Sequence, residues 1–283
     1  MRIANVSGRL ALVVDDGCID VHDASGGRFG PEPAAAFAAW DDLRDWAASA
    51  AGPGRPLDPS DLGAPSPEPR QVFAVGLNYA SHAAESGLEL PAMPAVFTKY
   101  PASLGGPFAP IELSGDTVDW EVELVVVIGR RADRVPEAQA WDHVAGLCVG
   151  QDVSDRTVQF AAGAQFSLGK SYRTYGPTGP WLVTPDELAD PDDLELGCAI
   201  DGETVQRDRT SGLVFPVPRL IAEISAVVPL LPGDVVFTGT PAGVGVTRRP
   251  PRFLRAGEVL ESWVEGVGTI RNVVVAPTAE EQP

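Results

Sequence analysis

Three carboxylates in apolar surroundings are the residues of this sequence best suited to hold a metal ion. Glu121 and Glu123 lie in the run 119–128, and Asp152 follows the apolar run 144–149. Because side chains alternate along a strand, both glutamates share one face, where burial without a cation would be costly. Carboxylates without a thiolate suit Mg²⁺, Mn²⁺ or Ca²⁺. The alternative is that the glutamates lie on the solvated face of an edge strand and that Asp152 begins a turn.

A histidine and a glutamate three residues apart have the spacing of a general-base pair. His82 and Glu85 follow an apolar run at 72–75, in a segment with the composition of a helix start. Both would face one side of that helix, so the carboxylate could orient the imidazole and raise its basicity. Such a pair can take a proton from water. Taken alone, His82 is more often a partly exposed helix histidine without a catalytic role.

Two glycine-rich segments could present backbone groups to a ligand. Residues 164–171, which contain Lys170, have the spacing of a degenerate phosphate-binding loop, but the Gly- and Pro-rich segment 172–181 cannot form the helix that such a loop needs. Nucleotide binding is therefore not expected. The loop 239–245 could offer the Thr240 hydroxyl and N–H groups to a ligand, or it could be only a turn.

Charge and cysteine content exclude several classes of partner. Thirty-nine acidic against 21 basic residues give a formal charge of −18, which would repel nucleic acids and anionic membranes. The cysteines, Cys18, Cys148 and Cys198, lack the spacing of a disulfide framework or a thiolate metal site. No stretch approaches the roughly 18 apolar residues that a membrane span needs. We therefore expect a soluble, cytoplasmic protein that binds neither nucleic acid nor membranes.

The elements that must position these side chains are short, because 30 glycines and 27 prolines interrupt the chain. Strand-like apolar runs cover residues 72–75, 95–98, 121–128, 144–149, 194–200, 235–238, 259–264 and 269–275. A helical pattern covers 217–228, and hairpin turns are expected at 201–202 and 266–268. This pattern predicts an α+β fold that is mainly β.

The chain changes character near residue 70. Residues 2–21 predict a hairpin around Asp16 and Gly17, and residues 33–51 predict an Ala-rich helix. Between 52 and 69, nine of 18 residues are Gly or Pro, a density that no helix or central strand tolerates. We expect a small N-terminal α+β unit and linker over 1–69, with a structural role, and a catalytic domain over 70–278.

Six segments, in this order, resemble the fumarylacetoacetate hydrolase family over about residues 72–275. They are GLNYASHAAE (76–85), DWEVEL (119–124), QDVSDRTVQ (151–159), GKS (169–171), GPTGPW (176–181) and PGDVVFTGTPAGVG (232–245). The resemblance implies a mixed β-sandwich roll that pairs as a homodimer. It also implies that Glu121, Glu123 and Asp152 bind Mg²⁺ or Mn²⁺, and that His82 with Glu85 activates water or moves a proton.

The same resemblance implies how a substrate is held. Lys170 would be the cationic partner of a substrate enolate, and the other expected contacts are Tyr79, Arg156, Gln159, Gly239 and Thr240. Arg173 departs from the family pattern, since many relatives have an acidic residue there. If Arg173 faces the pocket, its cationic fork favours a second substrate carboxylate; if it faces outward, it pairs with surface acids.

We therefore predict a metal-dependent hydrolase that cleaves a carbon–carbon bond in an acylpyruvate-like or related β-dicarbonyl acid, a small 2-oxo acid. One alternative uses the same metal and enolate for decarboxylation of oxaloacetate, or for isomerisation or decarboxylation of a 2-oxo-alkenedioate. An alternative from another class is a non-catalytic acidic module that binds Ca²⁺ or a protein partner. The spread of the carboxylates over distant strands, with His82 and Lys170 in matching motif positions, argues against such a module.

Overall fold

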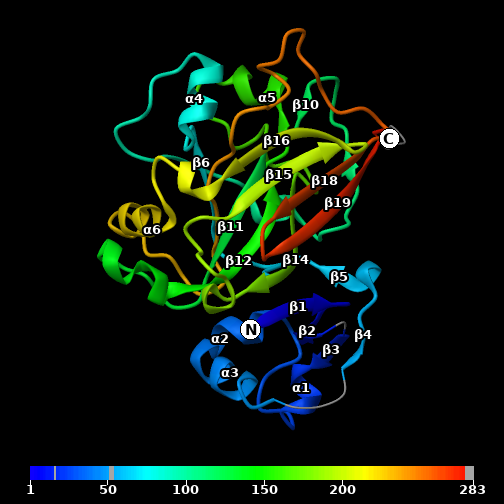
Figure 1. The fold of residues 1–283 in the computed structure, drawn as a ribbon, viewed down its shortest axis with the longest axis vertical. Helices are drawn as coiled ribbons and strands as arrows, with labels where there is room; N and C mark the ends of the chain where they lie inside the picture. Colours follow the sequence, from blue (N-terminus) through cyan, green and yellow to red (C-terminus); the bar gives the residue numbers. More distant parts are fainter. Residues whose placement is uncertain (16, 51–53, 278–283) are drawn as a thin grey trace, which may run out of the picture.

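The computed structural model describes residues 1–15, 17–50 and 54–277, and most of its strands join one large sheet (Figure 1). The strands of this sheet are β1 (Arg2–Val6), β2 (Arg9–Val14), β3 (Gly17–Asp20), β4 (Arg55–Pro56), β5 (Leu62–Gly63), β6 (Val72–Gly76), β7 (Ala95–Thr98), β8 (Leu104–Gly105), β11 (Val122–Ile128), β12 (Val144–Gln151), β14 (Gly176–Val183) and β17 (Val235–Phe237). Their order is β4-β3-β2-β1-β14-β12-β11-β17-β6-β7, while β5 pairs with β1 and β8 with β14.

A second sheet of five strands packs against the large one. Its order is β16-β15-β18-β19-β9. The bounds of these strands are β9 (Ile111–Glu112), β15 (Glu195–Ile200), β16 (Glu203–Arg209), β18 (Val259–Val264) and β19 (Gly268–Val275), and a separate pair joins β10 (Val118–Asp119) to β13 (Ser154–Asp155). Leu124 and Leu147 of the large sheet share one buried apolar cluster with Leu196 and Val264 of the small sheet. The main core therefore lies between the two sheets, which Figure 1 draws one in front of the other.

Short helices connect the strands in the described part of the chain. They are α1 (Val21–Ala24), α2 (Ala34–Ala38), α3 (Trp40–Ala47), α4 (Ala80–Ser86), α5 (Arg156–Ala161) and α6 (Val217–Ser225), with 3₁₀ turns η1 (Pro59–Asp61), η2 (Pro101–Ser103), η3 (Glu137–His143), η4 (Pro185–Glu187) and η5 (Thr210–Gly212). The helix expected over 33–51 is two helices, because Ala39 has φ −143° and interrupts the hydrogen-bonding pattern. Residue 51 of that prediction lies outside the described residues.

The mainly β, α+β fold predicted from the sequence is the fold of the protein, and each expected strand run and both hairpin turns are present. Among the strands of more than two residues, β14 and β16 were not in the predicted strand runs. The glycines and prolines of β14 are typical of turns, yet β14 is a strand that pairs with both β12 and β1. In β16, polar and charged residues form the outer edge of the small sheet. These two strands owe their conformation to pairing partners, which local sequence does not reveal.

Strand β11 is central, which corrects the alternative that Glu121 and Glu123 lie on a solvated edge. It pairs with β12 on one side and β17 on the other, and all its residues are buried. Gly150 lies opposite Glu123 in this ladder. A Cβ atom at Gly150 would clash with the Val125 side chain of β11, so glycine allows β12 to lie close beside the glutamate-bearing strand.

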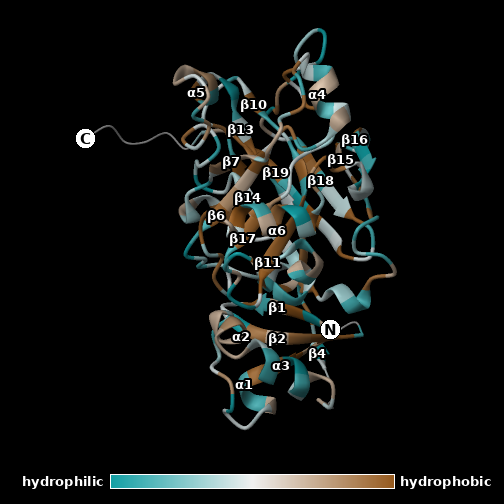
Figure 2. Cartoon of the chain, turned by 90° about the vertical axis from the view of Figure 1, so that its left-hand side faces the viewer, coloured by the Kyte–Doolittle hydropathy of each residue, from teal (hydrophilic) through white to brown (hydrophobic). Residues whose placement is uncertain are grey.

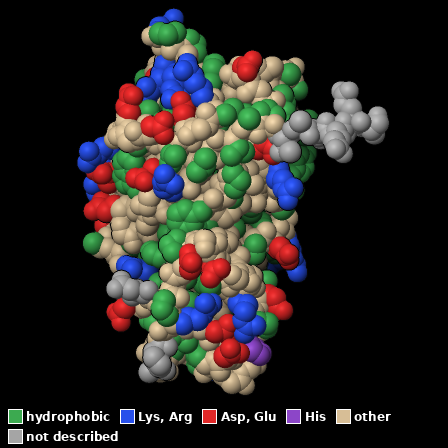
Figure 3. Space-filling view, turned by 90° about the vertical axis from the view of Figure 1, so that its right-hand side faces the viewer, with side chains coloured by type: hydrophobic (Ala, Val, Ile, Leu, Met, Phe, Trp, Pro, Cys, Tyr) green, Lys and Arg blue, Asp and Glu red, His purple; other side chains and the backbone are tan. Residues whose placement is uncertain are grey.

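The N-terminal residues continue the large sheet, because β1 pairs with β14 through Arg2 and Ile3. Strands β2 and β3 form the expected antiparallel hairpin, although Asp16 of its predicted turn lies outside the described residues. Apolar ribbon is concentrated in the strands (Figure 2), and acidic side chains lie beside basic ones over much of the face in Figure 3. No helix in the described ranges is both long and apolar enough to span a bilayer.

Candidate active site

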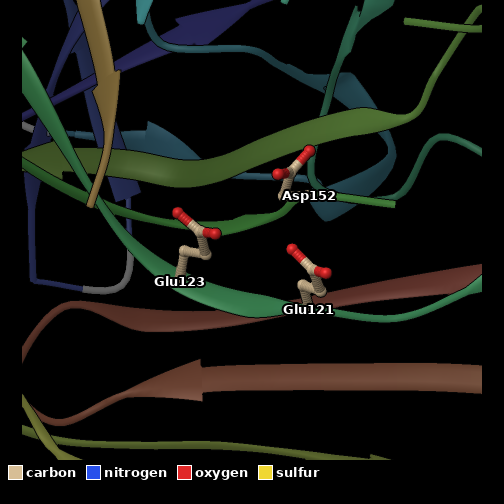
Figure 4. A group of neighbouring side chains, drawn as sticks. All are labelled: Glu121, Glu123 and Asp152. Atoms are coloured by element: carbon tan, nitrogen blue, oxygen red, sulfur yellow. The ribbon is translucent and has the colours of Figure 1, made fainter. Parts of the chain in front are cut away.

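The three predicted metal ligands converge in the interior. Glu123 of β11 and Glu121, the residue just before that strand, extend toward Asp152, which follows β12 (Figure 4). One oxygen from each lies within 4.8 Å of the others, and the residues are 5%, 1% and 1% exposed. Three converging carboxylates form a hard oxygen donor set, which fits Mg²⁺ or Mn²⁺ and leaves further coordination positions for other oxygen ligands.

Each of the three carboxylates has one oxygen held by a neighbouring group. The Gly239 N–H donates to Glu123 Oε2 at 2.7 Å, and Arg156 Nη2 lies 2.7 Å from Glu121 Oε1. Lys99 Nζ donates to Asp152 Oδ1 at 2.7 Å. These partners fix the orientation of the carboxylates and leave a second oxygen of each side chain for a cation.

Lys170 Nζ occupies the position between two of those remaining oxygens. It donates to Glu121 Oε2 and to Asp152 Oδ2, both at 2.7 Å. A divalent cation held by the same carboxylates would therefore compete with the ammonium for these two atoms. Released from one of them, Lys170 would face whatever anion lies beside the cation.

The surroundings of the site shift the pKa values of Glu121 and Glu123 in opposite directions. Burial favours the neutral form of Glu121, but the charges of Lys170 and Arg156 outweigh it and lower its pKa to about 2. Burial, together with the charges of Asp152 and Glu121, raises the pKa of Glu123 well above its ordinary value. Glu123 has a backbone N–H where the other two carboxylates have a cationic side chain, so its ionised form gains most from a bound cation.

His82 and Glu85 form the expected pair on α4. His82 Nδ1 lies 2.8 Å from Glu85 Oε1. Because an ionised carboxylate only accepts hydrogen bonds, Nδ1–H is the donor in the neutral ring and Nε2 is left free to accept a proton. Glu85 Oε2 also accepts from Gly243 N at 2.9 Å and from Thr247 Oγ1 at 3.0 Å. These contacts tie α4 to the loop that follows β17.

Glu85 is held in its ionised form by those partners. Burial raises its pKa, but the hydrogen bonds from His82, Gly243 and Thr247 lower it overall below the ordinary value for glutamate. An ionised Glu85 keeps the proton of His82 on Nδ1.

The residues expected to hold substrate are largely engaged with the protein itself. Arg156 donates through Nε to Asp119 Oδ2 at 2.9 Å and through Nη1 to Gln159 Oε1 at 2.8 Å. Thr240 Oγ1 donates to the Val122 carbonyl at 2.9 Å. Arg156, Gln159 and Thr240 nevertheless line the same cavity as the carboxylates.

Tyr79 and Arg173, which were also expected to contact substrate, lie outside the cavity lining. Tyr79 is fully buried in the core between the sheets, outside the group that lines the cavity, and its hydroxyl is without a hydrogen-bond partner among the described atoms. Arg173 is exposed and lies outside the cavity lining. Of the two placements considered for Arg173, the outward one is therefore observed.

Sequence reasoning missed two charged residues of the site. Lys99 is fully buried beside Asp152, and Asp119 is fully buried where it accepts from Arg156, from Gly245 N at 2.7 Å and from Val246 N at 2.9 Å. Asp119 stands two residues before Glu121 in the run 119–128, where alternation along a strand predicts a shared face, and this was an available signal. Lys99 follows a predicted strand, and nothing in its local sequence distinguishes it from a surface lysine.

The cavity has a volume of about 130 Å³, and both His82 and the carboxylate cluster line it. Its charged or titratable lining residues are His82, Glu121, Glu123, Asp152, Arg156 and Lys170. Its apolar lining includes three aromatic side chains, Phe97, Phe160 and Phe166, that the sequence alone did not indicate. A general base, a carboxylate cluster and an ammonium group thus face one small space.

Comparison with known proteins gives matches over most of the chain. The family model described as fumarylacetoacetate (FAA) hydrolase C-terminal matches residues 71–275. A crystal structure of a "putative HpcE protein" from Mycobacterium smegmatis is 52% identical, covers 98% of this chain and 100% of its own, and has a TM-score of 0.95.

Two further crystal structures carry names of different activities. A 5-carboxymethyl-2-hydroxymuconate delta-isomerase from Mycobacterium smegmatis is 34% identical with a TM-score of 0.76, and the match covers 98% of this chain and 100% of that one. A maleylpyruvate hydrolase from Sphingobium sp. SYK-6, in complex with manganese(II) and pyruvate, is 28% identical with a TM-score of 0.81 and the same coverage. Both share the fold of this protein over nearly its whole length.

Proposed function

Because the chain belongs to the fumarylacetoacetate hydrolase family, we propose that it is a divalent-metal-dependent hydrolase that cleaves a carbon–carbon bond in an acylpyruvate-like 2-oxo acid. One observation carries this proposal. His82, joined to Glu85 at 2.8 Å, lines the same cavity as the cluster of Glu121, Glu123 and Asp152. Hydrolysis needs a general base close to the cation site, whereas a binding module has no use for such a base.

Glu121, Glu123 and Asp152 are the residues that would hold Mg²⁺ or Mn²⁺. When bound, such an ion supplies Lewis-acid polarisation of the oxygens of a 2-oxo acid and stabilises the negative charge of its enolate. The manganese and pyruvate in the Sphingobium relative support this ligand class. Arg156, Lys99 and Gly239 keep the three carboxylates oriented toward the shared position.

His82 is the general base in this mechanism. Its Nε2 takes a proton from water, and Glu85 stabilises the imidazolium that forms. The hydroxide adds to the remote acyl carbonyl carbon, and the bond from that carbon to the adjacent methylene then breaks. The electron pair remains on the methylene as a pyruvate enolate, which takes up a proton to give pyruvate, while the acyl group leaves as a carboxylic acid.

Lys170 neutralises the enolate in this mechanism. Its ammonium lies 2.7 Å from carboxylate oxygens of both Glu121 and Asp152, so it is poised beside the position of the 2-oxo acid. Arg156, Gln159 and Thr240 line the same cavity, and the Gly239 N–H donates to Glu123 Oε2. We also propose, from the family, a cytoplasmic homodimer in which residues 1–69 are structural.

A decarboxylase or isomerase of the same site is the second candidate, and the isomerase name of a relative that is 34% identical favours it. Decarboxylation of oxaloacetate and isomerisation of a 2-oxo-alkenedioate need the same electron sink but no attacking water. In both, His82 would transfer a proton to or from carbon.

Product analysis tests these activities. Purified protein is incubated with acetylpyruvate, fumarylpyruvate, oxaloacetate and a 2-oxo-alkenedioate, with Mg²⁺ and after chelation. Pyruvate plus the matching carboxylic acid, lost on chelation, is the expected result. Pyruvate and CO₂ from oxaloacetate alone would make the protein a decarboxylase, and conversion of the alkenedioate without water uptake would make it an isomerase.

A further inference from the structure

An aromatic wall leads from the carboxylate cluster to the surface. Lys170 Nζ lies 5.3 Å from the centre of the Phe97 ring. The Phe97 and Phe166 rings meet edge to face at 5.7 Å, and Phe166 meets Phe160 in the same manner at 6.3 Å. Three rings therefore form a continuous apolar path that starts beside the ammonium group and ends in solvent.

The outer end of this path exposes apolar surface. Phe160 and Leu88 both line the cavity, yet they are 54% and 55% exposed. Leu77 and Val246 add aliphatic surface to the same cavity. Large apolar side chains grouped at the mouth of a site gain free energy when a ligand covers them.

Among the described residues that line the cavity, no cationic side chain is left unpaired for a second anionic group of the substrate. Among its described lining residues, the permanently charged cations are Arg156 and Lys170, and both form ion pairs with the carboxylate cluster or with Asp119. Arg173, the residue that could have recruited a second carboxylate, is exposed outside the lining. A carboxylate at the far end of a substrate would lie against phenyl rings, where it would lose part of its hydration and gain no cationic partner.

We infer that the cavity selects 2-oxo acids whose remote end is apolar, aromatic or alkyl, against those whose remote end is a carboxylate. This inference rests on the proposed function for the 2-oxo acid head, which the carboxylate cluster and Lys170 receive. Phe97, Phe166 and Phe160 are then the residues that determine specificity. A ligand whose phenyl end is covered in this site should bind roughly 10- to 100-fold more tightly than a ligand that places a carboxylate there.

Binding of two unreactive 2-oxo acids tests the inference without relying on turnover. The full-chain protein, saturated with Mg²⁺, is titrated calorimetrically with 4-phenyl-2-oxobutanoate and with 2-oxoadipate, which share the head group and differ at the far end. The expected result is that the phenyl compound binds at least about 10-fold more tightly. Equal affinity, or tighter binding of 2-oxoadipate, would overturn the inference.

A pair of variants locates the selectivity. Phe160→Arg places a cation at the mouth and should reverse the preference, or reduce it at least about 10-fold. Phe108→Arg is the matched control, because Phe108 is also an exposed aromatic residue but lies outside the cavity lining. An unchanged preference in Phe160→Arg, with the native melting temperature retained, would contradict the assigned role of the wall.

Turnover of benzoylpyruvate and fumarylpyruvate separates this inference from the proposed function. A higher kcat/KM for benzoylpyruvate supports both. Cleavage of fumarylpyruvate in preference overturns the inference and leaves the hydrolase proposal intact. Cleavage of neither compound, with the phenyl 2-oxo acid still bound preferentially, overturns the hydrolase proposal and supports the inference.

Discussion

Lys99 and Asp152 form an ion pair that is entirely removed from solvent. Lys99 Nζ lies 2.7 Å from Asp152 Oδ1, and the two side chains are 0% and 1% exposed. The ammonium also donates to the backbone carbonyls of Lys170 and Tyr175, so each of its three protons has an acceptor. Asp152 in turn holds Lys170 through its other oxygen. Lys99 therefore fixes the orientation of Asp152, and through Asp152 that of Lys170.

Replacing Lys99 by Met is expected to destabilise the fold strongly. The substitution leaves Asp152 buried beside one cation instead of two and leaves two carbonyls without a donor, at a cost of about 3–5 kcal/mol. Urea denaturation measures the free energy of unfolding. Arg207→Met is the control, because Arg207 pairs with Glu195 at 2.7 Å on the surface and its loss should cost about 0–1 kcal/mol. Equal losses in the two variants would contradict the special role of Lys99.

Replacing His82 by Ala is expected to lower kcat about 10²- to 10⁴-fold and to leave metal affinity nearly unchanged. The imidazole supplies the base for water, whereas the carboxylate cluster is independent of it. Steady-state kinetics and a manganese titration measure the two quantities. His22→Ala controls for loss of a histidine, since His22 lies in α1, far from α4, which carries His82 (Figure 1). Unaltered turnover in the His82 variant would remove the assigned role.

Replacing Glu123 by Gln is expected to weaken Mn²⁺ binding about 10-fold or more, because a neutral amide replaces a charged ligand while the Gly239 N–H keeps an oxygen acceptor. Isothermal titration calorimetry of the metal alone gives the affinity. The exposed Glu203, at the hairpin turn of the small sheet, offers Glu203→Gln as a variant of equal charge change. If both variants bind Mn²⁺ like the native protein, the cluster is not the metal site.

Replacing Lys170 by Met is expected to separate metal binding from catalysis. The ammonium shares two carboxylate oxygens with the expected ion, so its removal should tighten Mn²⁺ binding about 10-fold or more through lost charge repulsion. Turnover should fall because the enolate loses its cationic partner. Calorimetry and kinetics on the same preparation test this. Weaker metal binding together with lower turnover would indicate a structural defect rather than the proposed competition.

Acidification is expected to remove the stability that Glu85 contributes. The pKa of Glu85 is lower in the folded protein than in the unfolded chain, so the contribution is complete above the ordinary glutamate value and is lost as the pH falls through the folded value. The free energy of unfolding of the native protein should therefore decline more steeply than that of Glu85→Gln as the pH falls below the ordinary glutamate value of about 4.3. Parallel declines would show that Glu85 is not stabilised by its partners.

Local patterns predicted the strands better than they predicted the site. Strands with continuous apolar runs, such as β11 and β12, were evident because burial on both faces leaves a compositional mark. The conformation of β14 was not evident, since its glycines and prolines are typical of turns and only pairing with β12 and β1 makes it a strand. Ala39 interrupts the Ala-rich helix although alanine itself favours helix, which shows tertiary packing overriding propensity.

The sequence by itself determined which groups were available for chemistry. The alternation Glu121-Val-Glu123 placed two carboxylates on one strand face, and the spacing of His82 and Glu85 placed both on one helical face, because these periodicities follow from backbone geometry alone. The order of the motifs then identified the family.

Only the tertiary structure decided which cations face those carboxylates. Lys99 follows β7, whereas Arg156 and Lys170 lie in the chain after β12, and all three form ion pairs with the carboxylate cluster. It also placed Arg173 in solvent and three phenyl rings beside Lys170. Contacts between residues far apart in the chain depend on packing, and no local pattern records them, so the charge and polarity of the cavity became visible only in the folded protein.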